Sequence, residues 1–247
     1  MIHIRGPAEV SNILISGQIV KRTLEVLEKY IVPGMETLEL DRIAEEYIRG
    51  QDAIPGFKGL YGFPATLCIS IDDEVVHGIP GKRKLKEGEI VGIDVGVLKN
   101  KYYGDHARTF AVGKISEKKQ KLIDITRECL SVGIQQAIPG KRIGDIGFAI
   151  QKHAEKNGFS VVRELVGHGI GTDLHEEPQI PNFGKKNRGA LIDAGMCFAI
   201  EPMINMGQPD VRTLNDGWTV VTHDGLPSAH FEHTVTITAN GPEVLTN

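Results

Sequence analysis

The sequence predicts an α+β fold of two similar halves, each with two helices followed by strands of a curved antiparallel sheet. Helical periodicity occurs in two pairs of segments, and β-branched runs of strand length follow each pair. Two landmarks recur at almost the same offset. Pro33-Gly34 returns 106 residues later as Pro139-Gly140, and GEIVGID, ending in Asp94, returns 107 residues later as GMCFAIE, ending in Glu201. This repeat indicates an internal duplication within one domain. The domain is expected to span residues 1–247, with pseudo-repeats at about 8–112 and 114–239.

The composition is that of an ordinary globular protein, with 40% hydrophobic and 24% charged residues. A formal net charge of −4 supplies no basic field, so nucleic acid is not an expected partner. The basic run at residues 82–86 is better explained as a solvated loop than as a phosphate site. Three cysteines without a C-x-x-C pair argue against a disulfide framework or a zinc ribbon. With no signal-peptide core and no apolar run of membrane-spanning length, we expect a cytoplasmic protein without membrane contacts.

The first half begins with two amphipathic helices. The first is expected from about Pro7 to Tyr30, because Pro7 suits a first helical turn and Pro33-Gly34 terminates the pattern. The second is expected from about Leu38 to Arg49. A loop rich in glycine, proline and aromatic residues then covers 54–64, before a strand at Ala65–Ile71.

A hairpin with two aspartates follows. Asp94 lies in the middle of an apolar, β-branched run, where a buried carboxylate persists only if it is paired, hydrogen-bonded or bound to a metal. A tight turn at Lys99 and Asn100 would set Asp94 directly opposite Asp105, about 5 Å apart at Cβ. Two bare carboxylates would repel at that distance, whereas two metal ions would suit them. Two surface aspartates beside a turn are the alternative explanation.

The second half repeats the helix pair, at about Glu117–Ala137 and Ile143–Asn157. It also supplies Glu201 and Glu232, each inside a strand pattern, and a two-fold arrangement would bring Asp94 and Glu201 together. Backbone N–H groups alone could satisfy any one of these acids, but four together require a cation.

Histidines complete this ligand set. In GHGIGTDLHEEP, His168 stands between two glycines, which allow a close backbone approach, and His175 follows seven residues later. Four carboxylates and one imidazole suit Mn, Fe(II), Co(II) or Zn. His77, at the Gly-Pro turn of HGIP, is by itself better explained as a surface residue than as a catalyst.

At this point the chain resembles type I methionine aminopeptidase, a metallopeptidase of the pita-bread fold. The resemblance covers nearly the whole chain, through the phrases HGIP, GDHARTF and GHGIGTDLHEEP and the Glu-Pro after Ala-Ile. It implies two divalent metal ions, chosen from Co, Mn, Fe and Zn, and removal of the initiator methionine through attack of a metal-bridged water or hydroxide on the scissile carbonyl. The implied metal ligands are Asp94, Asp105, His168, Glu201 and Glu232, with Asp105 and Glu232 bridging the two ions.

The resemblance also assigns roles to neighbouring side chains. It implies that His175 lies near the scissile carbonyl and its oxyanion, that His77 lies near the following amide nitrogen, and that Glu201 accepts a proton from the attacking water. A thioether fits an apolar, aromatic slot. The implied substrate-binding residues are His77, His175, Leu60, Tyr61, Phe63, Cys68 and Trp218. Leu60 and Leu174 depart from the Tyr and Phe that many relatives carry, and core packing also explains Cys68.

Three further histidines lie beside the expected ligands. In regular strands His106 and His233 point away from the faces of Asp105 and Glu232, whereas His230 shares the face of Glu232 and could approach the site.

The expected partners are nascent chains and peptides that begin with Met and have a small second residue. The protein is expected to be a monomer, and any ribosome contact would use the surface of the catalytic domain.

Prolidase and aminopeptidase P resemble this chain too but carry an additional N-terminal domain. A non-enzymatic pita-bread protein, or a structural metal-binding protein without turnover, is the other alternative.

Overall fold

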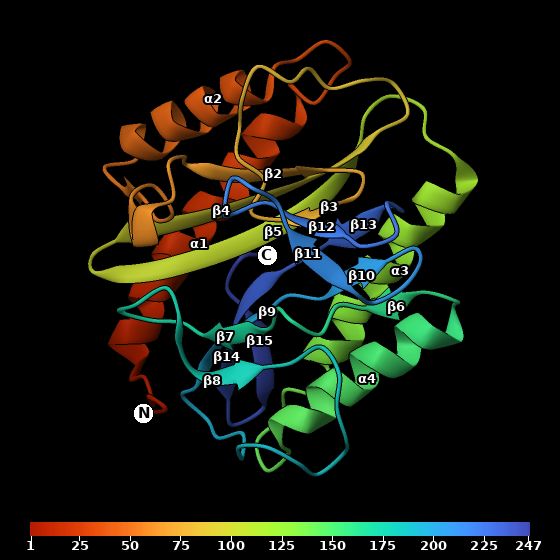
Figure 1. Ribbon diagram of the computed structural model, residues 1–247. Coiled ribbons are helices and arrows are strands. Elements are labelled where there is room, and N and C mark those ends of the chain that lie inside the picture. The colour runs from red at the N-terminus through yellow and green to blue at the C-terminus, as the bar shows by residue number, and fades with distance from the viewer.

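The computed structural model describes all residues, 1–247. Two pairs of helices lie on opposite sides of the molecule, with the strands between them (Figure 1). The helix pair of the first half is α1 (Pro7–Glu28) and α2 (Thr37–Gly50), and that of the second half is α3 (Glu117–Ile134) and α4 (Ile143–Lys156). All four predicted helices are therefore present, with ends within about three residues of the expected positions. The chain has no helix with the length and apolar character that crossing a membrane requires.

The strands are antiparallel and form four sheets. In the first sheet β4 pairs with β5, β1 and β2; their bounds are β1 (Ile54–Pro55), β2 (Leu67–Ile71), β4 (Ile90–Lys99) and β5 (Tyr102–Ala111). The largest sheet has the order β15, β14, β9, β7, β8; its strands are β7 (Gly167–Gly169), β8 (Glu176–Ile180), β9 (Cys197–Ile200), β14 (His233–Thr238) and β15 (Gly241–Val244).

Two small sheets complete the structure, and a short 3₁₀ turn covers Leu60–Gly62. One small sheet contains β3 (Glu74–Val76), β11 (Val211–Thr213) and β12 (Val220–Thr222). The other contains β6 (Ser160–Val161), β10 (Met203–Asn205) and β13 (Ser228–His230).

The register of the central hairpin corrects one prediction. The turn lies at Asn100 and Lys101, with φ of 52° and 70°, and not at Lys99 and Asn100. Positive φ at both central residues is the type I′ turn that suits a tight hairpin, and asparagine tolerates it. Asp94 therefore pairs with Ala107, and Asp105 pairs with Gly96. Because side chains alternate with a period of two, this change makes the aspartates diagonal neighbours but keeps them on one face.

Each helix pair covers its own hydrophobic core. One cluster of 23 buried residues lies among α3, α4 and the second-half strands, and includes Phe198 and Ile146. Another of 19 buried residues lies among α1, α2 and the first sheet, and includes Leu24 and Ile93. Two cores with the same helix-pair arrangement favour the proposed pseudo-repeats at 8–112 and 114–239, which remain an interpretation.

The central hairpin also joins the two halves. Thr234 of β14 exchanges two hydrogen bonds with the backbone of Asp105, at 3.0 and 2.8 Å, and Glu232 N donates to Ala107 O at 3.0 Å. These contacts fix the strand that carries Asp105 beside the strand that follows Glu232. Acids from opposite halves are thereby brought to one place.

Candidate metal centre and active site

The two aspartates of the hairpin are the first part of the site. Both lie on the same face of the hairpin, and Asp105 is 4% exposed. Gly96, opposite Asp105, has no side chain, and a Cβ there would lie 2.5 Å from the ring of Phe57. Glycine at this position therefore lets Phe57 pack against the hairpin beside the aspartates.

His168 reaches the site from β7, and its neighbours explain its position. A Cβ at Gly167 would lie 2.4 Å from Ala199 O, and one at Gly169 would lie 2.3 Å from Glu177 O, so only glycine allows this strand to fit between β8 and β9. The Nδ1 atom of His168 lies 2.9 Å from Gly169 O. A proton on Nδ1 would make this hydrogen bond and leave the Nε2 lone pair directed toward the acids, as a metal-binding histidine requires.

Glu201 and Glu232 come from the ends of two paired strands. Glu201 directly follows β9 and Glu232 directly precedes β14, and these strands pair through His233 and Ile200. Glu201 Oε1 lies 3.5 Å from His168 Nε2, and Asp105 Oδ2 lies 4.0 Å from the same nitrogen. Asp105, His168 and Glu232 each offer one ligand atom within 4.8 Å of the other two. Asp94, Glu201 and these three residues line one cavity.

The buried oxygens of this cluster fit a cation. Asp94 Oδ1, Asp105 Oδ1 and Glu232 Oε1 are inaccessible to solvent and have no hydrogen-bond partner. Leaving a buried acceptor unpaired is costly, and leaving several charged ones together is more so. Carboxylate oxygens with one imidazole nitrogen are a donor set that suits divalent Mn, Fe, Co and Zn. The residues present therefore match the metal site that the sequence predicts.

Burial is the main cause of the shifted pKa values in the site. Burial raises the pKa of Asp94 to about 7. Burial, together with the charges of the neighbouring acids, raises the pKa values of Asp105, Glu201 and Glu232 well above their ordinary values. Burial lowers the pKa of His168 to about 3, so this imidazole is neutral. Burial thus favours the protonated acids, whereas a bound cation would favour their charged forms.

His77 and His175 lie at the same cavity, from different elements. His77 directly follows β3 and has a φ of 59°, a strained value for a residue other than glycine. Gly78 permits this turn, because a Cβ there would lie 2.1 Å from Ile69 O. His175 directly precedes β8, and its ring centroid lies 4.5 Å from that of His168. Burial lowers the pKa of both His77 and His175, and the proximity of His175 lowers that of His77 further.

A buried ion pair holds the segment that carries His175. Arg5 Nη2 donates to both carboxylate oxygens of Glu176 at 2.6 Å, and the two side chains are only 7% and 6% exposed. This pair ties the residue after His175 to the N-terminal segment before α1 and restricts the position of the imidazole.

The whole cavity has a volume of about 80 Å³, and the wall beside the acids and histidines is an apolar slot. Phe63 and Trp218 meet edge to face at its wall, with ring centroids 5.1 Å apart. Tyr61 is 74% exposed, and its ring stacks on His175 at a centroid distance of 5.9 Å. The predicted substrate-binding residues Leu60, Tyr61, Phe63, Cys68, His77, His175 and Trp218 all line this cavity.

The sequence prediction omitted three residues from the site. Phe57 and Leu174 line the apolar slot. Phe57 lies in the aromatic loop before β2, where nothing in the local pattern distinguishes it. His230 is buried, and its Nε2 lies 3.7 Å from Glu201 Oε2. Its place on the face of Glu232 is the signal that indicated it. His106 and His233 stack on each other, with centroids 4.6 Å apart, and neither lines the cavity.

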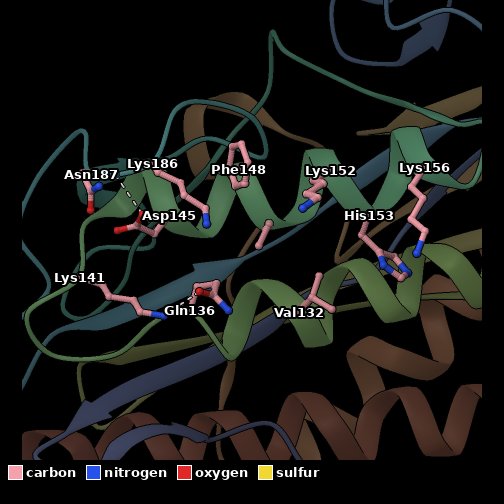
Figure 2. Close-up of a pocket in the computed structure, with 11 residues that line it drawn as sticks. Val132, Gln136, Lys141, Asp145, Phe148, Lys152, His153, Lys156, Lys186 and Asn187 are labelled. Carbon is pink, nitrogen blue, oxygen red and sulfur yellow. Dashed lines mark hydrogen bonds between the residues drawn. The ribbon is translucent and has the colours of Figure 1, made fainter.

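A larger hollow of about 570 Å³ lies between α3 and α4, away from this centre (Figure 2). Four lysines line it: Lys141, Lys152, Lys156 and Lys186. Its one carboxylate, Asp145, accepts hydrogen bonds from the backbone N–H groups of Asn187 and Arg142, at 3.0 and 2.9 Å. With a single, already bonded acid, this hollow is no second metal centre.

Comparisons with known proteins identify the family of this chain. The model of metallopeptidase family M24 matches residues 11–239, and the chain belongs to that family. It is 54% identical over 246 residues to the methionine aminopeptidase of Clostridium perfringens, and 52% identical over 246 residues to methionine aminopeptidase 1 of Bacillus subtilis. Each match covers 100% of this chain and 99% of the relative. The resemblance to type I methionine aminopeptidase is confirmed, and so is the expectation of a metallo-exopeptidase.

Solved structures confirm the pita-bread fold. The crystal structure of methionine aminopeptidase from Thermotoga maritima matches with a TM-score of 0.98 and 44% identity, covering 100% of both chains. Prolidase from Pyrococcus furiosus matches with a TM-score of 0.79 and 22% identity, covering 99% of this chain and 65% of that one. At that identity the prolidase shares the fold alone.

Proposed function

We propose that this protein removes the N-terminal initiator methionine from nascent proteins and peptides, with preference for a small second residue. The observation that carries the proposal is a single cavity in which five acid and imidazole ligands adjoin an apolar slot for one side chain. Relatives at 44–54% identity over the full chain carry the name methionine aminopeptidase. A long groove for many residues would suit an endopeptidase, whereas a cavity of about 80 Å³ suits a terminal residue.

Two divalent cations, chosen from Co, Mn, Fe and Zn, are proposed at Asp94, Asp105, His168, Glu201 and Glu232. When bound they supply Lewis acidity for the scissile carbonyl and lower the pKa of the attacking water toward neutrality. Glu201 is the proposed proton acceptor from that water, because its side chain is 14% exposed and lies beside His168 in the cavity that holds the ligands.

The two cavity histidines act on the substrate in this proposal. His175 would donate a hydrogen bond to the oxyanion of the tetrahedral intermediate, and its edge-to-face packing on His168 holds it beside the ligand cluster. His77 would contact the amide nitrogen after the scissile bond. His77 already lines the cavity from a backbone with a φ of 59°.

The apolar slot accounts for methionine at the first position. A thioether packs favourably against aromatic edges, and Phe63 and Trp218 supply them. Cys68 lies 5% exposed at the same wall, and burial raises the pKa of its thiol well above the ordinary value, so it serves as a neutral, apolar surface. We further propose a cytoplasmic monomer whose catalytic-domain surface makes any ribosome contact.

Peptide cleavage after metal removal and restoration tests the proposal. The enzyme is treated with a chelator, then loaded with Mn(II) or Co(II), and methionine release is measured from Met-Gly-Met-Met and from a matched peptide with proline second. Metal-dependent release from the first peptide only, absent in Asp105→Asn and strongly slowed in His77→Ala, is the expected result. Metal binding without cleavage of either peptide would refute the catalytic function and leave a metal-binding module.

A further inference from the structure

Glu201 lies between two imidazoles, of which the predicted ligand set contains only one. Its Oε1 lies 3.5 Å from His168 Nε2, and its Oε2 lies 3.7 Å from His230 Nε2. His230 is 3% exposed, and its Nε2 has no hydrogen-bond partner. A buried polar nitrogen without a partner is costly, so its position against a carboxylate oxygen requires an explanation.

The backbone holds His230 firmly in this place. Its N–H donates to Thr109 Oγ1 at 2.9 Å, and the Thr109 hydroxyl donates to His230 O at 2.8 Å. Thr109 belongs to β5, the strand that also carries Asp105. His230 also pairs with Met203 of β10, two residues after Glu201. The backbone of His230 is thus anchored to the strand of one ligand and to the segment that follows another.

We propose that His230 is a positioning residue for Glu201: its Nε2–H donates to Glu201 Oε2 and keeps Oε1 directed at the metal centre. The 3.7 Å separation is a few tenths of an ångström beyond a hydrogen bond, and such contacts tighten when an active site is loaded. Carboxylate ligands of metal sites are themselves held by hydrogen bonds, and His230 is placed to donate one to Glu201, whereas the Nε2 atom of His168 carries the lone pair that would bind the metal. The role rests on the proposed metallopeptidase function.

One feature favours a donor over a further metal ligand. The two imidazoles contact different oxygens of Glu201: His168 Nε2 lies beside Oε1, and His230 Nε2 lies beside Oε2.

Three variants test this role. His230→Ala removes the donor, and His230→Gln replaces it with an amide N–H of similar reach. His233→Gln is the matched control, because this half-buried histidine directly follows Glu232 and contacts the Thr246 hydroxyl at 2.8 Å instead. Thermal unfolding first establishes that each variant is folded. Titration calorimetry with Mn(II) then measures metal affinity, and methionine release at saturating Mn(II) measures kcat and KM.

For His230→Ala we expect metal affinity to fall by about 10- to 100-fold, and kcat to fall with KM nearly unchanged. His230→Gln should recover most of both losses, and His233→Gln should bind Mn(II) as the wild type does. Equal affinity and kcat in wild type and His230→Ala would overturn the proposal. A loss of one nitrogen ligand from the spectrum of the Co(II)-loaded His230→Ala protein would also overturn it, because His230 would then be a ligand. Calorimetry measures Mn(II) affinity without any peptide cleavage. A protein that binds Mn(II) but cleaves no peptide would therefore refute the proposed function and still allow the role of His230 to be tested.

Discussion

Removing one acid from the metal centre should stabilise the metal-free protein and abolish its stabilisation by metal. Burial holds the pKa of Asp94 at about 7, against an ordinary 3.8. Between these values the folded chain binds more protons than the unfolded chain, so the free energy of unfolding falls as the pH rises from about 4 to about 7. For Asp94 alone the loss is roughly 4 kcal/mol, since one pKa unit corresponds to about 1.4 kcal/mol.

Asp94→Asn removes this loss because asparagine does not ionise. At pH 8, in the presence of a chelator, we expect the variant to be more stable than the wild type by up to about 4 kcal/mol, or about 8 to 16 °C in Tm for a chain of this size. At pH 4 the two should be alike. Excess Mn(II) should narrow this difference at pH 8, because binding at 100 times the Kd stabilises the wild type by about 2.7 kcal/mol and the variant does not gain that stabilisation.

The assay is thermal unfolding at pH 4 and pH 8, with chelator or with Mn(II). Asp193→Asn, at an exposed aspartate, is the control and should change Tm little in all conditions. A metal-free wild type that becomes more stable between pH 4 and pH 8, or an Asp94→Asn protein that is less stable than wild type at pH 8 in chelator, would refute the reasoning from buried carboxylates.

Three further predictions follow from the site. His175→Ala should lower kcat by about 10²- to 10³-fold with little change in KM, because an oxyanion donor acts mainly in the transition state; a larger effect on KM than on kcat would contradict that role. Trp218→Ala should raise KM for Met-Gly-Met-Met more than it changes kcat, whereas removal of the exposed Tyr30 side chain should change neither. Met1 should be retained, because Ile2 is not a small second residue and its backbone forms a β-bridge with Glu177. Intact-mass measurement of the native protein checks this prediction.

The elements of the fold follow closely from local sequence. All four helices were predicted from the spacing of apolar residues and from the Pro-Gly pairs that follow α1 and α3, because helix formation depends on short-range contacts. The exact turn of the central hairpin was not predicted. Lys99, Asn100 and Lys101 are all compatible with a turn, and the choice depends on pairing along ten residues of each strand.

The face of each hairpin acid was predicted despite that error. A shift of the turn by one residue moves the partner of Asp94 by two positions, from Asp105 to Ala107. Because side chains alternate between the two faces with a period of two, both aspartates stay on the same face. The position of His168 was likewise predictable, because glycines on both sides already indicate close backbone approach.

The sequence by itself determined which residue types form the site: acids within apolar strands, a histidine between glycines, and an apolar loop nearby. The free-energy cost of burying a charged side chain among apolar neighbours depends on the residue types, so the sequence alone indicates it. Only the tertiary structure decided that Phe57 packs on Gly96 beside those acids, and that His230 stands behind Glu201. Both contacts join segments far apart in the chain, and the packing of two halves across the hairpin, rather than any local pattern, brings such segments together.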